Sequence, residues 1–186
     1  IVSIVSRRVG GYPKNLLENS VITDLAVHDI DLFNHFLGKE PLSVHSHTTK
    51  TGESNRINSA EILLNYDGAG CISQVNWITP TKIRTISITG TLGHIEVNNI
   101  TQEINLYQNN QSQIFKNFDD YVLKFGSPII QKIEVNGREE PLRLELEAFV
   151  SSILNNKDPQ VSGEDGLKAL KIAIKALNGG YKSVHP

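Results

Sequence analysis

The stretch from 23 to 38 constrains this chain most, because apolar residues dominate it and yet four ionisable side chains recur at helical spacing. These four are Asp24, His28, Asp31 and His35. At 3.6 residues per turn they fall within a narrow arc of one helix, and apolar residues cover most of the remaining surface. The pattern predicts an amphipathic helix over 23–37, capped by Thr23 and ended by Gly38, that carries a carboxylate and an imidazole beside a hydrophobic core.

A series of strand candidates surrounds this helix, one before it and six after it. They are residues 1–8, 42–49, 57–66, 70–77, 84–89, 93–98 and 102–108,. Asp67-Gly68-Ala69-Gly70 is typical of a hairpin loop, which predicts that the strands on either side of it are antiparallel,. Residues 129–135 form a further strand candidate, whereas 110–128 indicate a loop with one short helix at 118–125.

The C-terminal part returns to helical periodicity. Residues 142–154 place apolar side chains at helical spacing, and the stretch 155–159 stops that helix at a proline,. Ser162 to Asp165 resembles a capping sequence for a last helix over 164–178,. The order of elements predicts an α+β fold: one large, mostly antiparallel open sheet with helices packed on one face.

The other face of the sheet is expected to serve for oligomerisation. Residues 60–66 and 71–77 carry apolar side chains on both alternating sets, so that both faces of these strands need cover,. We therefore expect a second copy of the chain to bury this face, in a homodimer or homotetramer.

Composition excludes several classes of function. The 186 residues, 39% of them hydrophobic, suffice for a single domain over 1–186, and a net charge of -2 gives no reason to expect nucleic acid or a membrane surface as a partner,. A single cysteine, Cys71, excludes an internal disulfide framework and suits a reducing compartment, the cytoplasm,. The chain opens directly in strand-like alternation and contains no methionine, so we expect an N-terminal portion to be missing.

No dinucleotide-binding motif is recognisable. Such a motif needs a glycine-rich turn between a strand and a helix, where backbone N–H groups and the helix N-terminus hold the pyrophosphate. Gly68-Ala69-Gly70 and Gly90-Thr91-Leu92-Gly93 both lie between expected strands. The sequence therefore predicts no nucleotide-binding half within these residues.

Three stretches, in this order, carry a resemblance to a known family. They are Arg-Arg-Val-Gly-Gly-Tyr-Pro at 7–13, Asp-Leu-Ala-Val-His-Asp-Ile-Asp at 24–31 and Trp-Ile-Thr-Pro-Thr-Lys-Ile-Arg at 77–84. Together with the ending over 140–166, they make the chain similar to the C-terminal domain of Gfo/Idh/MocA-type oxidoreductases, which act on sugars, inositols and nucleotide sugars. The first two stretches look closest to the nucleotide-sugar dehydrogenases of this family.

The resemblance implies a two-domain enzyme. Its missing front half would be a Rossmann domain that binds NAD or NADP and carries a catalytic lysine, and the present domain by itself is expected to be inactive. Asp24 and His28 match the acid and the histidine that complete the family's catalytic set. The substrate expected is a small sugar or nucleotide sugar.

The chemistry suits these residue types. Oxidation of a secondary alcohol sends a hydride to the nicotinamide while a base removes the hydroxyl proton, and imidazoles ordinarily titrate at about pH 6.5. The general base expected is His28. Asp24 either accepts an imidazole N–H and fixes the tautomer of the ring, or binds a neighbouring substrate hydroxyl, and the sequence leaves both roles open.

The expected substrate-binding residues are Arg8, Tyr12, Lys82 and Arg84. The three cations either meet a substrate phosphate or are ordinary surface charges, and Tyr12 either stacks on a sugar or fills the core. For Trp77 we expect core packing.

Other interpretations of the histidines remain. The stripe Asp24, His28, Asp31 and His35 also has the composition of a metal site, as in a metal-dependent hydrolase, but we expect no metal and only structural or solvated roles for Asp31 and His35. His45 and His47 share one face of a strand and are expected to be solvated. A non-enzymatic sugar-binding or assembly module of the same fold is the main alternative to a dehydrogenase domain.

Overall fold

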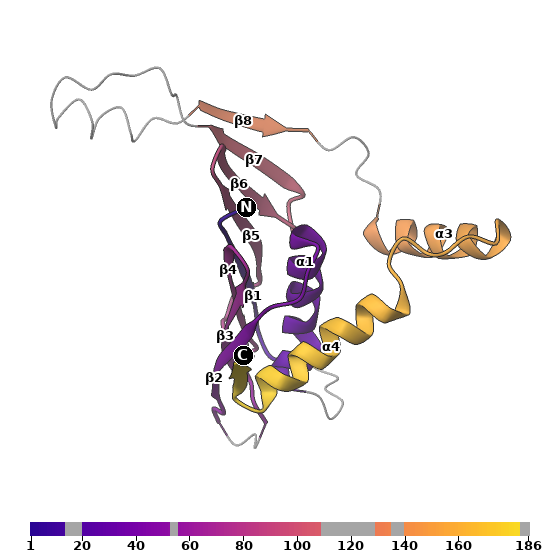
Figure 1. The fold of residues 1–186 in the computed structure, drawn as a ribbon. Coiled ribbons are helices and arrows are strands. Elements are labelled where there is room, and N and C mark those ends of the chain that lie inside the picture. Colours follow the sequence, from indigo (N-terminus) through magenta and orange to yellow (C-terminus); the bar gives the residue numbers. More distant parts are fainter. Residues whose placement is uncertain (14–19, 53–55, 109–128, 135–139, 183–186) are drawn as a thin grey trace, which may run out of the picture.

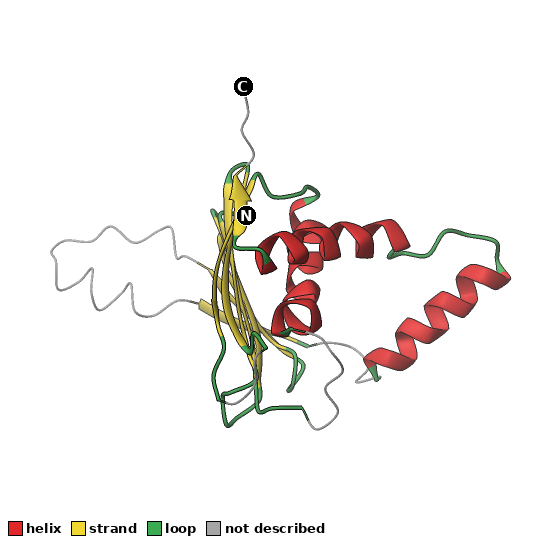
Figure 2. Ribbon diagram, turned by 90° about the horizontal axis from the view of Figure 1, so that it is seen from below, coloured by secondary structure: helices red, strands yellow, loops and turns green. Residues whose placement is uncertain are grey.

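A computed structural model describes residues 1–13, 20–52, 56–108, 129–134 and 140–182. The short helix predicted at 118–125 lies outside these residues. Within them the predicted α+β architecture is confirmed, with one large sheet and with helices on one of its faces (Figures 1 and 2).

The described strands form a nine-stranded sheet in the order β8-β7-β6-β5-β1-β4-β3-β2-β9. Their bounds are β1 Ser3–Val9, β2 Ser43–Thr49, β3 Ser59–Tyr66, β4 Ala69–Asn76, β5 Ile83–Gly90, β6 Gly93–Asn98, β7 Glu103–Gln108, β8 Ile129–Ile133 and β9 Gly180–Lys182. The strands predicted from the sequence are thus confirmed, with shifts of one or two residues at their ends, and β9 is an addition.

Strand β1 lies in the middle of the sheet between β4 and β5. It pairs with β4 in parallel, whereas all other pairs in the described sheet are antiparallel. The hairpin predicted between β3 and β4 is confirmed: Tyr66 pairs with Ala69, and Gly68 adopts a φ of 82° in the two-residue turn. Glycine is favoured there because a side chain would strain this left-handed conformation.

Alternation along the strands separates a covered face from an open one. On β3 the side chains of Ala60, Ile62, Leu64 and Tyr66 are buried, and those of Glu61, Leu63 and Asn65 are exposed. The buried set faces the helices η1 (Ile22–Ala26), α1 (Val27–Leu37) and α4 (Gly163–Leu177). The core lies between these helices and the sheet, with Phe33 of α1 and Ile172 of α4 among its fully buried members.

The predicted helix over 23–37 is confirmed, but its start differs from the prediction. Its first turn, η1, is a π-helix whose N-cap position is Val21 instead of Thr23 and has no side-chain cap. Thr23 instead exchanges hydrogen bonds with Ser20: the N–H of Thr23 donates to the Ser20 Oγ, and the N–H of Ser20 donates to the Thr23 Oγ1, both at 3.3 Å. The predicted end is confirmed, since Gly38 takes a φ of 65° and donates its N–H to the Asn34 carbonyl,.

The two C-terminal helices are also confirmed. Helix α4 begins with the predicted capping box, in which Ser162 and Asp165 exchange side-chain to backbone hydrogen bonds. Helix α3 (Pro141–Leu154) buries none of its residues, and its apolar stripe is exposed, with Phe149 at 57%. Both figures show α3 apart from the sheet. None of the described helices has the length and apolar character that a membrane span requires.

The buried thiol of Cys71 offers a test of the core. Burial raises the pKa of Cys71 from 9.0 to about 12, although a hydrogen bond with the Ile4 backbone acts in the opposite direction. At pH 8 the thiolate fraction is therefore about 1,000-fold lower than for an exposed cysteine. We expect a disulfide reagent such as dithionitrobenzoate to label the folded chain at least about 100-fold more slowly than the chain in guanidinium. Equal rates in both states would contradict the packing described for β4.

Candidate active site

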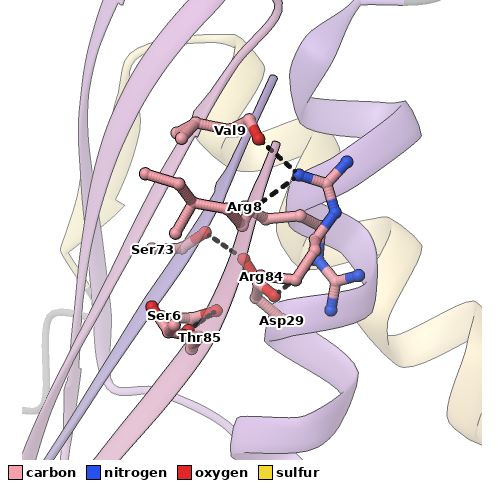
Figure 3. Close-up of polar contacts among 8 residues, drawn as sticks. Ser6, Arg8, Val9, Asp29, Ser73, Arg84 and Thr85 are labelled. Atoms are coloured by element: carbon pink, nitrogen blue, oxygen red, sulfur yellow. Dashed lines mark hydrogen bonds and ion pairs between the residues drawn. The ribbon is translucent and has the colours of Figure 1, made fainter. Parts of the chain in front are cut away.

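A buried ion pair fastens helix α1 to the centre of the sheet. The Arg8 Nε on β1 donates to the Asp29 Oδ1 at 2.9 Å, and the Ser73 Oγ on β4 donates to the other carboxylate oxygen at 2.8 Å (Figure 3). The Asp29 side chain is fully buried, whereas that of Arg8 is 17% exposed. A buried carboxylate requires such partners, so the three residues fix the rotation of α1 about its own axis.

A second arginine, Arg84, lies directly opposite Arg8 on the neighbouring strand. Arg84 of β5 is the register partner of Arg8, and its Nη1 donates to the carbonyl oxygens of Val9 and Ile83 at 2.7 and 2.9 Å. Figure 3 shows both guanidinium groups on the side of the sheet that α1 covers. Burial and then the charge of Arg8 lower the pKa of Arg84, while the carboxylates of Asp29 and Asp24 act to raise it. Arginine remains protonated at neutral pH, so this site holds two adjacent positive charges.

The predicted pair Asp24 and His28 lies on the adjoining turns of the same helix. Asp24 belongs to the π-helical turn and is half-buried, close enough to Arg84 to influence its pKa. His28 is exposed in the first turn of α1, next to the buried Asp29, and its imidazole makes no hydrogen bond with any other described residue. Because a π turn is wider than an α turn, the relation between Asp24 and His28 differs from that of a regular helix, and such turns are frequent at functional sites.

The two aromatic residues considered for sugar stacking, Tyr12 and Trp77, differ in burial. Trp77 is 3% exposed, which confirms the core packing predicted for it. Tyr12 is 48% exposed and packs edge-on against Trp77, with ring centroids 5.7 Å apart. Lys82 is exposed just before β5, beside Gly10. Tyr12 and Lys82 therefore lie just beyond the paired ends of β1 and β5, where Arg8 and Arg84 face each other.

The predicted stripe does not form one site along its whole length. Asp31 and His35, from the later turns of α1, line a separate cavity of about 680 Å³ between α1 and the start of α4, to which Asp165 and Lys168 also contribute. Asp24 and His28 are not among the described residues that line it. The chemistry expected of His28 therefore does not belong to this cavity.

The described residues contain no group of three or more His, Cys, Asp or Glu side chains placed to hold a metal ion. His45 and His47 are both exposed on β2, as predicted.

Sequence reasoning missed Asp29. The helical positions Ile22, Ala26, Ile30 and Phe33 are all buried, and Asp29 lies within the same stripe. A carboxylate within a core stripe needs a buried partner. The helical spacing of Asp29 from these apolar residues could therefore have indicated a buried ion pair.

The model of one protein family, described as the C-terminal alpha/beta domain of an oxidoreductase family, matches residues 14–179. The chain belongs to the Gfo/Idh/MocA oxidoreductase family. The resemblance predicted from three short stretches is thereby confirmed, and the matched residues include all described helices and all described strands except β1 and β9. No curated protein matches the chain significantly in sequence.

Solved structures share the fold at low identity. The UDP-N-acetylglucosamine 3-dehydrogenase GnnA from Acidithiobacillus ferrooxidans superposes with a TM-score of 0.76 at 17% identity, over 94% of this chain and 52% of its own. A levoglucosan dehydrogenase in complex with NADH and L-sorbose superposes with a TM-score of 0.78 at 12% identity, over 100% of this chain and 59% of its own. An oxidoreductase from Agrobacterium radiobacter in complex with NAD+, L-tartaric acid and magnesium superposes with a TM-score of 0.68 at 18% identity, over 98% of this chain and 56% of its own. The chain thus spans little more than half the length of these structures.

Proposed function

We propose that the chain is the catalytic and substrate-binding domain of an NAD(P)-dependent dehydrogenase that oxidises a secondary hydroxyl of a sugar, nucleotide sugar or inositol. His28 is the general base, and Asp24 assists it. The observation that carries this proposal is the exposed imidazole of His28 on a helix whose rotation is fixed by the buried Asp29. Membership of an oxidoreductase family supports it.

The described residues do not fit the phosphates of a dinucleotide. Gly68 lies in the turn between β3 and β4, and Gly90 to Gly93 connect β5 and β6, so neither turn opens a helix. In our proposal a separate N-terminal domain therefore binds NAD or NADP. When bound, the nicotinamide supplies the hydride acceptor.

The part of this chain in the reaction is to bind the sugar and to move a proton. His28 Nδ1 or Nε2 accepts the proton of the substrate hydroxyl, because an exposed neutral imidazole has an unshared pair at one ring nitrogen,. Asp24 lies in the preceding π turn and either holds the other ring N–H or binds a neighbouring hydroxyl of the sugar,. Tyr12 is 48% exposed at this end of the sheet, and we assign it a contact with the sugar,.

The reaction class is tested with the full-length protein and a panel of neutral sugars, inositol, sugar acids and nucleotide sugars. We expect at least one of them to reduce NAD+ or NADP+, followed at 340 nm. The 186-residue chain alone is the control, and calorimetry should detect no binding of either cofactor to it. No cofactor reduction with any member of the panel would contradict the proposed reaction, and micromolar cofactor binding by the chain alone would contradict the division of roles between the two domains.

We further propose that the open face of the sheet is an interface between copies of the chain. Val5, Ile72 and Leu63 are cross-strand partners on β1, β4 and β3 and form one apolar row, with exposed fractions of 38%, 42% and 48%. A row of this kind across the centre of a sheet favours burial against another sheet.

Replacement of both Leu63 and Ile72 by lysine is therefore expected to produce a monomer, because two charges would be buried at the centre of the interface. Light scattering should show a molar mass at least halved relative to the unmodified protein. Leu92→Lys is the matched control, since Leu92 is 80% exposed in the turn between β5 and β6. An unmodified protein that is itself monomeric would show that this face is left open.

A further inference from the structure

The guanidinium groups of Arg8 and Arg84 form the most unusual charged feature of the covered face. They are register partners on adjacent antiparallel strands, where like charges repel each other at close range,. Packing alone gives no reason to place two arginines opposite each other. On the same face of the same strand pair, four residues further along, the apolar residues Ile4 and Ile88 are opposite each other. The arrangement is more favourable if a third, negatively charged group joins the pair.

The Asp29 carboxylate contacts only Arg8 of the two arginines, and several N–H donors of the pair remain without a partner among the described residues. Asp29 takes only the Nε of Arg8, and its second oxygen is occupied by Ser73. Arg84 spends Nη1 on two neutral carbonyl groups. The Nη1 and Nη2 groups of Arg8, and the Nε and Nη2 groups of Arg84, meet no acceptor within the part of the chain that the structure describes.

These remaining donors are positioned and partly accessible. The Arg8 side chain is 17% exposed and held at Nε by a buried carboxylate, and Arg84 is half-buried and held at Nη1 by the strand backbone. Because the fixed ends need no further ordering, the free ends lose little freedom when they bind a ligand. Planar N–H forks match the geometry of carboxylate and phosphate oxygens.

The pair is also linked to the turns that carry the proposed catalytic residues. The carboxylate of Asp24 acts to raise the pKa of Arg84. Asp29, the ion-pair partner of Arg8, directly follows His28 on α1. The turns of η1 and α1 that carry Asp24 and His28 therefore also carry the carboxylates that act on the two arginines.

We propose that Arg8 and Arg84 together bind an oxyanion of the substrate, a carboxylate or a phosphate group, so that the enzyme acts on an acidic or phosphorylated sugar derivative. This inference rests on the proposed function for the identity of the ligand as a substrate. Asp29 is then a positioning residue that keeps Arg8 in place for the ligand.

Binding is tested on the 186-residue chain without cofactor. The probes are D-glucuronate for the carboxylate, D-glucose 1-phosphate for the phosphate and D-glucose as the neutral control, and the readout is the NMR signal of each arginine Nε–H. We expect at least one anionic probe to shift the signals of Arg8 and Arg84 in a saturable way, and D-glucose to leave them unchanged. A response to glucuronate alone identifies a carboxylate site, and a response to the phosphate alone identifies a phosphate site.

Arg7 provides a matched control, because it is the neighbour of Arg8 on β1 but lies on the open face, where its Nε donates to Gln74 Oε1. We expect Arg84→Gln to weaken binding of the anion at least tenfold and Arg7→Gln to change it less than twofold. Arg84→Lys keeps the charge without the fork and should give an intermediate loss. If Arg84→Gln fails to fold, the Nε–H signals of Arg8 and Arg84 in the unmodified chain still test whether an anion binds to them.

The proposal is overturned if neither anion shifts the Arg8 and Arg84 signals, or if Arg7→Gln weakens binding as much as Arg84→Gln. These outcomes are separate from the fate of the proposed reaction. A full-length enzyme that oxidises only neutral sugars keeps the dehydrogenase function and rejects the anion site. An anion that binds to a protein without dehydrogenase activity keeps the site and rejects the reaction.

Discussion

Replacement of His28 by alanine in the full-length protein is expected to lower kcat by about 10²–10⁴-fold with the best substrate of the panel. The physical reason is that the exposed imidazole is the group proposed to take the hydroxyl proton, and alanine offers no acceptor in its place. The affinity for NAD or NADP should stay unchanged, because the cofactor is proposed to bind to another domain. Steady-state kinetics and cofactor titration measure the two quantities.

His45→Ala is the matched control for this variant, since His45 is an exposed histidine on the open face of β2. Turnover of His28→Ala close to that of the unmodified enzyme would reject the assignment of the base. Asp24→Asn separates the two roles left open for Asp24. A fall in kcat that is not additive with His28→Ala indicates that it orients the imidazole, and a rise in KM alone indicates that it binds substrate.

Replacement of Asp29 by alanine is expected to lower the free energy of unfolding by about 3–5 kcal/mol. The carboxylate is fully buried, and its loss leaves the Nε of Arg8 and the hydroxyl of Ser73 without their partner inside the protein,. The Arg8 and Arg84 charges would then face each other without this counter-charge. Chemical denaturation followed by circular dichroism measures the change.

Asp67→Ala is the control for this prediction, because Asp67 is 85% exposed and its nearest ion-pair distance, to Lys39 Nζ, is 4.0 Å. Its replacement should change the free energy of unfolding by less than about 1 kcal/mol. Joint replacement of Arg8 by methionine and Asp29 by leucine removes both charges at once and should recover most of the lost stability. Equal effects of Asp29→Ala and Asp67→Ala would show that the buried pair does not fasten α1 to the sheet.

Most of the fold could be predicted because its signals are local. Alternation marks β3 and β4, the Asp67-Gly68 turn marks their antiparallel pairing, and Gly38 marks the end of α1. The central place of β1 has no such signal. Its pairing with β4 and β5 depends on which strands fit together in three dimensions, and no local pattern in residues 1–8 contains that information,.

The geometry of the proposed site could be predicted only in part, for a related reason. The spacing of Asp24 and His28 predicts that they lie on one helix, but it does not predict the π-helical turn around Asp24. An α turn and a π turn differ by a shift of one residue in hydrogen bonding, so packing of η1 against α4 and β4 can decide between them,. The contact between Asp29 and Arg8 joins two segments distant in the sequence and became visible only in the folded chain.

The position of β1 has a consequence for how the domain assembles. Strands β2 to β4 form one ribbon and β5 to β8 another, each built from neighbours along the chain, and within the described sheet β1 is the seam that joins them. Ribbons of sequential neighbours form quickly. A seam between distant segments closes slowly, because the entropy of closing a long loop is lost before stabilising contacts form. Destabilising the seam should therefore let the halves of the sheet come apart while each ribbon persists, and amide hydrogen exchange would record this as early opening along β1.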